Sequence, residues 1–440
     1  MATTRELIVK LLRSLGGRKE VELYLKQFAS VDQRRFAVIK VGGGLLAEDL
    51  EGLSSSLMFL QQVGLTPVVI HGAGPQLAAA FAEAGIDGDR WEDRTSPRAL
   101  ELVRRVFRQE NLRLVDSLEE MGARGRPIVG GVFEAELDAD APREQWVRIT
   151  QIHAAAVESS IRAGAMPILA SIGETAGGQL LDLGPDAATL ALARALEPYK
   201  IVLLRAAGGL RDDFGERISS INLAEDYEPL LAEPWVSPAL RHKLELIHAL
   251  LSELPRSSSV SITSPDLLAR ELFTHKGSGT LIRVGERVRC HHSLETVDLP
   301  RLAELLRASF GRPPVLDYFE KKPIWRIYLA DSYRAAAILT EEGPIPYLDK
   351  FATTGDAQGE GIGGSLWQRL GREVPRLYWR ARVDNPINAW YFQRADGSYT
   401  RGEWTVFWLG ITDFKTIEEC VERALAAPAT LKAHAIGPVP

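Results

Sequence analysis

The chain has 440 residues, of which 45% are hydrophobic and 25% are charged, and its formal net charge at pH 7 is -6. This length provides for two or three domains, each large enough for its own hydrophobic core. The negative charge and the lack of a basic cluster interleaved with aromatic residues argue against a nucleic-acid partner, and no apolar run approaches the roughly 20 residues that a membrane-spanning helix needs.

The N-terminal region, residues 1–29, has apolar positions at a helical period that is broken at Gly16-Gly17. It predicts two amphipathic helices that serve as a packing arm or dimer contact, with a regulatory role as the alternative. Its first residues are polar and lack a signal-peptide core, and the two cysteines, Cys290 and Cys420, form no metal pattern. We therefore expect a cytoplasmic protein without a bound metal.

Apolar strands alternate with helices between residues 30 and 285. The sequence predicts strands at 35–44, 65–74, 167–172, 200–204, 258–263 and 280–283, and helices at 46–63, 76–84 and 97–121. Such alternation favours an α/β fold with a mostly parallel sheet and helices on both faces. Ligands of these sheets bind beyond the carboxyl ends of the strands, which is where the glycine clusters fall.

Residues 286–299 are charged and polar, and we expect them to form a linker. Beyond the linker, the sequence predicts helices at 301–310 and 416–425 and strands at 325–329, 334–340, 346–352, 377–382, 390–394 and 406–409. This antiparallel-rich pattern indicates an α+β domain over residues 300–430, which is an ordinary size for one domain.

A glycine-rich turn follows the strand expected at 347–352 and opens the helix expected at 365–370. Glycine lets the backbone approach a ligand closely, and a helix N-terminus offers free N–H groups and a favourable dipole to an anion. The turn is therefore a candidate phosphate-binding loop, with a flexible surface loop as the alternative. Its residues are Gln358, Gly359, Glu360, Gly361, Ile362, Gly363 and Gly364.

Three motifs occur in order in this domain: YLDKF at 347–351, QGEGIG at 358–363 and RARVDNPINAWYF at 380–392. Together they resemble the vertebrate-like N-acetylglutamate synthases, a branch of the GNAT acetyltransferases that includes bacterial bifunctional N-acetylglutamate synthase/kinases. The resemblance implies acetyl transfer from acetyl-CoA to L-glutamate in arginine biosynthesis, with the glycine-rich turn on the CoA pyrophosphate. It also implies that Tyr391 is the general acid, for which a core aromatic is the alternative.

Glutamate carries two carboxylates, so its site requires cations. Arg380 and Arg382 share one face of a strand by the period of two, and a guanidinium can bind a carboxylate through two hydrogen bonds. Lys350 is a third available cation, and Asn385 can add an amide donor. The resemblance places Lys350, Arg382 and Asn385 at glutamate-binding positions, whereas a solvated strand face is the alternative for the two arginines.

The first region contains KVGGG, HGAGPQL, GPDAA, AAGGL and LRHKLE in this order, over about residues 30–285. This order resembles an amino-acid-kinase domain of the N-acetylglutamate kinase type, with Mg-ATP as its cofactor. The resemblance implies that Lys40 and Lys243 contact ATP phosphates, that Asp186 orients the reacting groups, and that Arg94 remains from a segment that binds the acetylglutamate carboxylate. The glycines implied to cradle acetylglutamate and phosphoryl oxygens are Gly43, Gly44, Gly72 and Gly74.

Several positioning groups of that family are replaced. Gly184-Pro185 stands for Asn-Ala, Arg205-Ala206-Ala207 for Thr-Gly-Thr, and Trp91-Glu92 for Asn-Gly. Because phosphoryl transfer depends almost entirely on positioning and electrostatics, these replacements predict an acetyltransferase with a degenerate kinase-like domain. The alternatives are a bifunctional synthase/kinase and a non-catalytic arginine sensor.

The segment FTHKGSGT at 273–280 is typical of a helix end followed by a turn. In arginine-sensitive members of the family, this segment and the N-terminal helix form the arginine pocket. The resemblance thus implies L-arginine as an allosteric effector, bound by Tyr24, Glu271 and the backbone at Gly277 and Gly279. It further implies a homo-oligomer, either a dimer or a tetramer.

Overall fold

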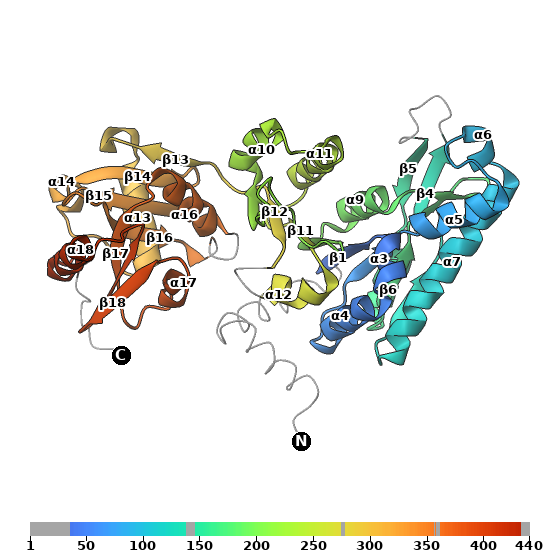
Figure 1. The fold of residues 1–440 in the computed structure, drawn as a ribbon, viewed down its shortest axis with the longest axis horizontal. Coiled ribbons are helices and arrows are strands. Elements are labelled where there is room, and N and C mark those ends of the chain that lie inside the picture. The colour runs from blue at the N-terminus through green and yellow to red at the C-terminus, as the bar shows by residue number, and fades with distance from the viewer. Residues whose placement is uncertain (1–35, 138–145, 274–277, 356, 358–360, 433–440) are drawn as a thin grey trace, which may run out of the picture. The chain divides into compact units, whose positions relative to one another are not determined.

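The structure is a computed structural model that describes residues 36–137, 146–273, 278–355, 357 and 361–432. The chain divides into two compact units (Figure 1). The first unit comprises Met1–Ile221 and Glu228–Val284, and the second comprises Asn222–Tyr227 and Gly285–Pro440. The helices expected within residues 1–29 lie outside the described residues.

The first unit is built on an eight-stranded sheet. Its strands are β1 (Ala37–Val41), β2 (Val68–His71), β3 (Gly125–Ile128), β6 (Met166–Ala170), β9 (Lys200–Leu204), β10 (Ser220–Asn222), β11 (Ser259–Thr263) and β12 (Thr280–Arg283). They lie in the order β10-β12-β11-β9-β1-β2-β6-β3. The six strands from β11 to β3 are mutually parallel, whereas β12 runs antiparallel to β11. The predicted mostly parallel sheet is confirmed.

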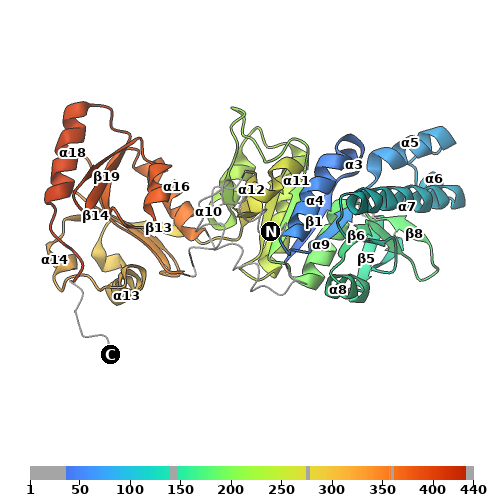
Figure 2. The ribbon, with the colours of Figure 1, turned by 90° about the horizontal axis from the view of Figure 1, so that it is seen from below.

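Helices cover both faces of this sheet, as predicted. They are α3 (Gly43–Glu48), α4 (Leu50–Gln62), α5 (Gly74–Ala84), α6 (Trp91–Arg94), α7 (Pro97–Glu120), α8 (Ala155–Arg162), α9 (Pro185–Leu196), α10 (Leu223–Ala232), α11 (Pro238–Glu253), η3 (Pro265–Leu267) and α12 (Leu268–Phe273). Side chains of β1 alternate between the faces: Ile39 and Val41 pack with α4 and α7, and Val38 packs with α8 and α9. Figure 2 shows these two pairs of helices on opposite sides of the sheet.

A second, four-stranded sheet of the first unit was not predicted. Its strands are β4 (Phe133–Leu137), β5 (Val147–Ile152), β7 (Ile172–Glu174) and β8 (Leu180–Asp182), in the order β5-β4-β7-β8. The strands β7 and β8 have three residues each, and β5 has no buried residue. Such short or exposed strands carry little of the hydrophobic alternation on which a sequence-based prediction depends.

The second unit contains a seven-stranded, mainly antiparallel sheet. Its strands are β13 (Val288–His291), β14 (Ile324–Ala330), β15 (Ala335–Thr340), β16 (Tyr347–Thr353), β17 (Leu377–Arg382), β18 (Gly397–Arg401) and β19 (Trp404–Leu409). They lie in the order β13-β14-β15-β16-β17-β19-β18. The predicted α+β architecture is confirmed.

Two local predictions in the second unit are wrong. The expected linker at 286–299 contains β13, which pairs with β14, so this segment belongs to the sheet. In place of the strand expected at 390–394, residues 390–392 form the end of helix α17 (Asn388–Phe392). A short apolar run such as Trp390-Tyr391-Phe392 does not distinguish a strand from a buried helical turn by its periodicity.

Helices also cover both faces of the second sheet. They are η4 (Leu294–Thr296), α13 (Leu299–Phe310), α14 (Tyr318–Lys321), α16 (Ile362–Glu373), α17 and α18 (Phe414–Ala426). On β17, Trp379 packs in the core that α16 completes, whereas Tyr378 packs in the core that α18 completes. Leu302 and Leu306 of α13 pack with β14, β15 and β16 on the same face as α18. The sheet therefore has an α16 face and an α18 face.

The described part of the chain contains neither a membrane-spanning helix nor a metal-binding cluster. None of its helices combines the length and the apolar character needed to cross a membrane. Within these residues, no three His, Cys, Asp or Glu side chains come together as a metal site. Cys290 and Cys420 are free thiols.

Candidate functional site

Three charged side chains of the first unit meet beside the carboxyl end of β1. The Lys40 ammonium lies 3.0 Å from Asp186 Oδ1, and the Lys243 ammonium lies 3.3 Å from Asp186 Oδ2. Lys40 comes from β1, Asp186 from the first turn of α9, and Lys243 from α11. The structure thus brings together the three charges that the sequence predicted for phosphoryl transfer.

The Asp186 carboxylate is held in its ionised form between these lysines. Burial alone would raise the pKa of Asp186, but the ammonium groups of Lys40 and Lys243 outweigh burial and lower the pKa below its usual value. The carboxylate fixes both ammonium groups while 43% of its own side chain stays exposed. Two ammonium groups fixed in this way are suited to a phosphoryl group whose negative charge must be stabilised.

The predicted glycines let the loops around this site approach one another. A Cβ on Gly72 would lie 2.8 Å from Pro185 Cγ, and a Cβ on Gly43 would lie 2.8 Å from Ala73 Cα. At Gly44 and Gly74, by contrast, a Cβ would enter open space. The Gly72–Pro185 contact gives Pro185 a packing role, because it seats the start of α9 against the end of β2.

Arg94 is engaged by another part of its own unit. It ends α6, and its guanidinium donates to Asp182 Oδ2 on β8 at 3.1 Å and to the Gly88 carbonyl at 3.4 Å. Burial raises the pKa of Asp182, and the nearby Arg94 opposes this effect. The role of Arg94 in binding a substrate carboxylate stays a prediction.

Sequence reasoning missed a polar network between the two glycine loops. Gln76 Nε2 donates to the Gly43 carbonyl at 2.9 Å and to Glu110 Oε2 at 3.2 Å, and Arg113 donates to the same carboxylate at 3.1 Å. The network ties α5 and α7 to the loop after β1. The available signal was the position of Glu110 on α7, on the helical face that also presents Phe107 and Leu114 to the core.

The candidate acetyl-transfer site of the second unit lies where two parallel strands separate. The ladder between β16 and β17 is formed at one register position, Tyr347 with Tyr378, near the amino ends of both strands. Beyond it, the carboxyl ends diverge without a further ladder pair in the described residues. Backbone N–H groups on this side of β16 are therefore candidate donors to a thioester carbonyl, because an oxyanion hole needs such preorganised donors.

A β-bulge in β16 determines which side chains face which side. Opposite β15, Leu339 pairs with Leu348 and Ile338 pairs with Lys350, so that Asp349 is the extra residue. A bulge interrupts the alternation of side chains. As a result, Asp349 and Lys350 both lie on the α18 face, whereas Phe351 lies on the α16 face and packs with Trp367 of α16.

The described part of the glycine-rich segment forms the N-terminus of α16. Ile362, Gly363 and Gly364, which the sequence predicted as part of the turn, are the first residues of the helix. Gly361 has a positive φ of 71° and is the N-cap residue, and Ile362 is buried. The carbonyl of Gly361 accepts hydrogen bonds from the N–H groups of Gly364 and Ser365. A helix N-terminus presents its first N–H groups outward, so this end of α16 fits a pyrophosphate. Gln358, Gly359 and Glu360 lie outside the described residues.

Tyr391 belongs to an aromatic cluster on the α16 face. Its ring centroid lies 5.4 Å from that of Trp379 and 5.4 Å from that of Phe407, and it also contacts Trp367 and Trp390. Burial raises the pKa of Tyr391 well above its ordinary value. Its hydroxyl is therefore protonated at neutral pH, although a raised pKa also makes it a weaker proton donor. The structure shows the core packing of Tyr391, and its catalytic role stays a prediction.

Lys350 is buried on the α18 face among polar partners. Its ammonium donates to Asp349 Oδ2 at 2.5 Å and to Thr430 Oγ1 at 2.5 Å, and the Tyr318 hydroxyl donates to Asp349 Oδ2 at 2.6 Å. Burial lowers the pKa of Lys350, and the adjacent Asp349 carboxylate opposes this effect. The sequence predicted Lys350 but none of these partners, since Thr430 is 80 residues away.

The two predicted arginines flank Trp404 on the same face. The guanidinium carbons of Arg380 and Arg382 lie 4.0 Å and 5.3 Å from the centroid of its ring. Arg380 donates to backbone carbonyls at the end of α18, whereas Arg382 is half exposed and forms an ion pair of 3.3 Å with Glu403. Asn385 follows β17, and its side-chain oxygen accepts from the N–H of Ile387. The structure thus gathers three cations on one face.

The predicted arginine-binding segment is described in part. Glu271 is buried, and its Oε2 accepts hydrogen bonds of 2.7 Å from the N–H groups of Ser278 and Gly279. A Cβ on Gly279 would lie 2.1 Å from the Ile262 carbonyl oxygen, so the turn packs tightly on β11. Tyr24 and Gly277 lie outside the described residues.

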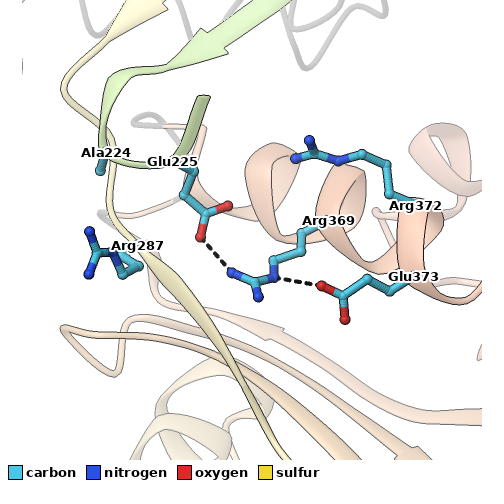
Figure 3. A pocket seen from close by; sticks show the side chains of 6 residues that line it. All are labelled: Ala224, Glu225, Arg287, Arg369, Arg372 and Glu373. Atoms are coloured by element: carbon cyan, nitrogen blue, oxygen red, sulfur yellow. Dashed lines mark hydrogen bonds and ion pairs between the residues drawn. The ribbon is translucent and has the colours of Figure 1, made fainter. Parts of the chain in front are cut away.

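A cavity of about 390 Å³ lies near the other end of α16 (Figure 3). Arg369 points between Glu225 and Glu373 and forms ion pairs of 3.0 Å and 3.1 Å with them. Its guanidinium also donates to the Val288 carbonyl. At about 1.5 Å of rise per residue, these side chains are roughly 10–15 Å along the helix from its N-terminus. The cavity is therefore separate from the candidate CoA-binding turn.

Comparisons with known proteins agree with this division of the chain. Residues 35–252 match the amino acid kinase family, and residues 289–426 match the N-acetyltransferase of N-acetylglutamate synthase. A protein of Xanthomonas campestris named acetylglutamate kinase is 47% identical over 95% of this chain and 100% of its own length. The human mitochondrial N-acetylglutamate synthase is 36% identical over 95% of this chain and 78% of its own length.

The fold has a solved counterpart. The N-acetylglutamate synthase of Neisseria gonorrhoeae, solved with coenzyme A and N-acetyl-glutamate, matches with a TM-score of 0.62 and 20% identity over 89% of this chain and 98% of its own. A structure of the same enzyme with coenzyme A and L-arginine matches with a TM-score of 0.53. At this identity, the likeness shows the fold. Taken with the two relatives of high coverage, it places the chain in the family of N-acetylglutamate synthases and acetylglutamate kinases that join an amino-acid-kinase region to an N-acetyltransferase region.

Proposed function

We propose that the second unit transfers an acetyl group from acetyl-CoA to the amino group of L-glutamate. The observation that carries this proposal is the separation of β16 and β17, with the N-terminus of α16 on one face and three cations on the other. Acetyl-CoA can thus approach from the α16 face and the dicarboxylic acceptor from the α18 face. Formation of N-acetylglutamate from these two substrates tests the proposal.

Each group of the site has a distinct task in this reaction. The first turn of α16 binds the pyrophosphate, and N–H groups of β16 polarise the thioester carbonyl. Lys350, Arg380 and Arg382 bind the substrate carboxylates. After the glutamate ammonium has lost a proton to water, its nitrogen attacks the thioester carbon, the C–N bond forms and the C–S bond breaks. Tyr391 supplies the proton for the departing CoA sulfur and regains a proton from solvent.

The N-cap of α16 should control the use of acetyl-CoA. Gly361→Val places a β-branched residue at a φ of 71°, and a left-handed conformation costs such a residue about 1–2 kcal/mol. We therefore expect the KM for acetyl-CoA to rise about 5- to 30-fold, with a smaller change in the KM for glutamate. Steady-state kinetics at varied acetyl-CoA measure this effect.

Gly371→Ala is the matched control for this prediction. Gly371 lies on the same helix, and a Cβ there would enter open space. Its substitution should leave both KM values unchanged. Unaltered acetyl-CoA kinetics in a folded Gly361→Val variant would place the CoA pyrophosphate elsewhere.

Arg382 is the cation best suited to a test of glutamate binding. Loss of Lys350 would leave the Asp349 carboxylate buried without its 2.5 Å partner, whereas Arg382 is half exposed. A charge-assisted hydrogen bond contributes about 1.5–3 kcal/mol, so Arg382→Ala should raise the KM for glutamate about 10- to 100-fold. The KM for acetyl-CoA should change far less.

Arg401→Ala provides the comparison for charge and exposure. Arg401 lies on β18, is 51% exposed and pairs with Glu422. This variant should retain wild-type kinetics. An equal loss of glutamate use in both variants would show that Arg382 acts through general charge rather than at the acceptor site.

We further propose that the first unit phosphorylates N-acetylglutamate with Mg-ATP. Sequence analysis predicted a degenerate kinase, and that prediction stays open, but two observations favour activity. Asp186 is assembled with Lys40 and Lys243, and the relative named acetylglutamate kinase is 47% identical over nearly the whole chain. Release of ADP that depends on acetylglutamate measures this second activity.

We also propose that L-arginine is an effector that binds the first unit. We propose further that the protein forms a homo-oligomer and is located in the cytoplasm. The Glu271 carboxylate organises the turn at Ser278 and Gly279, which is the segment implied for arginine. A ligand raises the melting temperature of the protein that it binds. We expect such a rise with L-arginine and a smaller one in Glu271→Gln. An equal rise in both proteins would remove this segment from the arginine site.

A further inference from the structure

The chain beyond α18 crosses the acceptor-side cations of the second unit. Arg380 Nη2 donates to the Pro428 carbonyl at 3.2 Å, whereas its Nη1 donates to the Ala424 carbonyl within α18 at 2.5 Å. Lys350 donates to Thr430 Oγ1 at 2.5 Å. The segment beyond α18 therefore occupies one hydrogen-bonding position on each of two cations that the dicarboxylic substrate needs.

The two hydrogen-bond partners of the Lys350 ammonium, Asp349 and Thr430, differ in the free energy that is needed to replace them. Asp349 is a carboxylate with a side chain that is only 5% exposed, and the Tyr318 hydroxyl fixes it, so breaking its pair with Lys350 is strongly unfavourable. Thr430 offers a neutral hydroxyl at a half-buried position. A carboxylate attracts the Lys350 ammonium by its opposite charge, which a neutral hydroxyl does not, so a substrate carboxylate can displace Thr430 but not Asp349.

The segment is attached weakly enough to move. An isolated antiparallel bridge joins Pro314 and Leu431, with hydrogen bonds from the Val315 N–H to the Thr430 carbonyl and from the Lys432 N–H to the Pro313 carbonyl. Residues 427–432 are exposed or half-buried, and none belongs to a hydrophobic core cluster. Segments with few buried apolar contacts open at low cost.

We propose that residues 427–432 form a strap that competes with the dicarboxylic acceptor for Lys350 and Arg380. The inference rests on the proposed acetyl transfer to glutamate. In the closed state the strap accepts one hydrogen bond from each cation, through Thr430 and Pro428, and in the open state the substrate carboxylates take their place. The apparent affinity for glutamate is then reduced by the fraction of molecules that are closed.

Loosening the strap should therefore improve the use of glutamate. Thr430→Val removes the competing hydroxyl, and Lys432→Pro removes an anchoring N–H without touching either cation. A net hydrogen bond corresponds to about a fivefold change in an equilibrium constant, so each variant should lower the KM for glutamate by about this factor. The KM for acetyl-CoA should stay constant, and Thr400→Val, which removes a threonine hydroxyl on β18, should match the wild type.

Locking the strap should have the opposite effect. Residues paired across an antiparallel bridge have Cα atoms about 4.5–5.5 Å apart, which is within the range of a disulfide. In the variant Pro314→Cys/Leu431→Cys, oxidation should suppress acetyl transfer at low glutamate, and a reductant should restore it. The wild type, with its own free thiols at Cys290 and Cys420, is the control for oxidation. Glutamate should also slow formation of the engineered disulfide, which is a readout independent of turnover.

The results of these experiments distinguish a failure of the strap proposal from a failure of the proposed acetyl transfer. Normal wild-type transfer with an unchanged or raised KM for glutamate in Thr430→Val and Lys432→Pro would overturn the strap alone. Full activity of the cross-linked variant would do the same. Absence of transfer in the wild type would overturn the proposed function, and the strap with it.

Discussion

Tyr391→Phe is expected to lower kcat for acetyl transfer about 100-fold, which is within the range for removal of a positioned general acid. The predicted role of the Tyr391 hydroxyl, which is protonated near neutral pH, is to donate a proton to the departing CoA sulfur. Phenylalanine preserves the ring that packs against Trp379 and Phe407. The fold and both KM values should therefore stay close to those of the wild type.

Tyr378→Phe is the control for this substitution. Tyr378 is also buried, but it lies on strand β17 and on the α18 face, and its pKa is raised to about 12, chiefly by burial. Its loss should leave kcat unchanged. Similar kcat values for wild type and Tyr391→Phe would show that Tyr391 serves packing, and equal losses in the two variants would point to a general effect on the core.

Asp186→Asn is expected to reduce acetylglutamate-dependent ADP release about 100-fold or more, since the loss of one positioned electrostatic group costs about this factor. The amide cannot hold Lys40 and Lys243 by charge as the carboxylate does. Acetyl transfer by the same protein should be unchanged, because the reaction is assigned to the other unit. ADP release and thiol release, measured on one preparation, give both values.

Glu253→Gln is the matched control, because Glu253 forms an exposed ion pair with Arg194 in the same unit.

For the wild type we expect ADP release of about 1 per second or faster, within the ordinary range for enzymes. Release at the background rate would instead support the degenerate kinase that the sequence departures predict. Normal ADP release by Asp186→Asn would remove Asp186 from the site.

The sequence predicted the frame of both units because buried strands leave clear patterns. The strand at 200–204 was located to the residue, since parallel strands buried on both faces are nearly continuous apolar runs. The antiparallel strand at 280–283 was also located to the residue. The strand β5 and the edge strand β13 were missed because exposed or partly polar strands lack that pattern. Residues 390–392 were misassigned because three successive aromatics suit a strand and a buried helical turn equally.

The sequence predicted those residues of the candidate sites that belong to recognisable motifs. Lys40, Asp186 and Lys243 come from distant motifs and meet as expected. Strict alternation would place Asp349 and Lys350 on opposite faces, and the bulge in β16 that unites them has no signal in the sequence. The partner hydroxyl of Thr430 is also beyond local reasoning, because tertiary folding alone brings residues 350 and 430 together.

The central claim is acetyl transfer to glutamate by the second unit, and release of free CoA thiol from acetyl-CoA tests it most directly. The full chain is incubated with acetyl-CoA and L-glutamate, and thiol release is followed with a colorimetric thiol reagent beside a reaction without glutamate. Mass spectrometry of the product identifies N-acetylglutamate. We predict thiol release that saturates with glutamate, matches the amount of N-acetylglutamate formed and falls about 100-fold in Tyr391→Phe. Thiol release that is independent of glutamate, or no N-acetylglutamate from an intact, folded protein, would contradict the account.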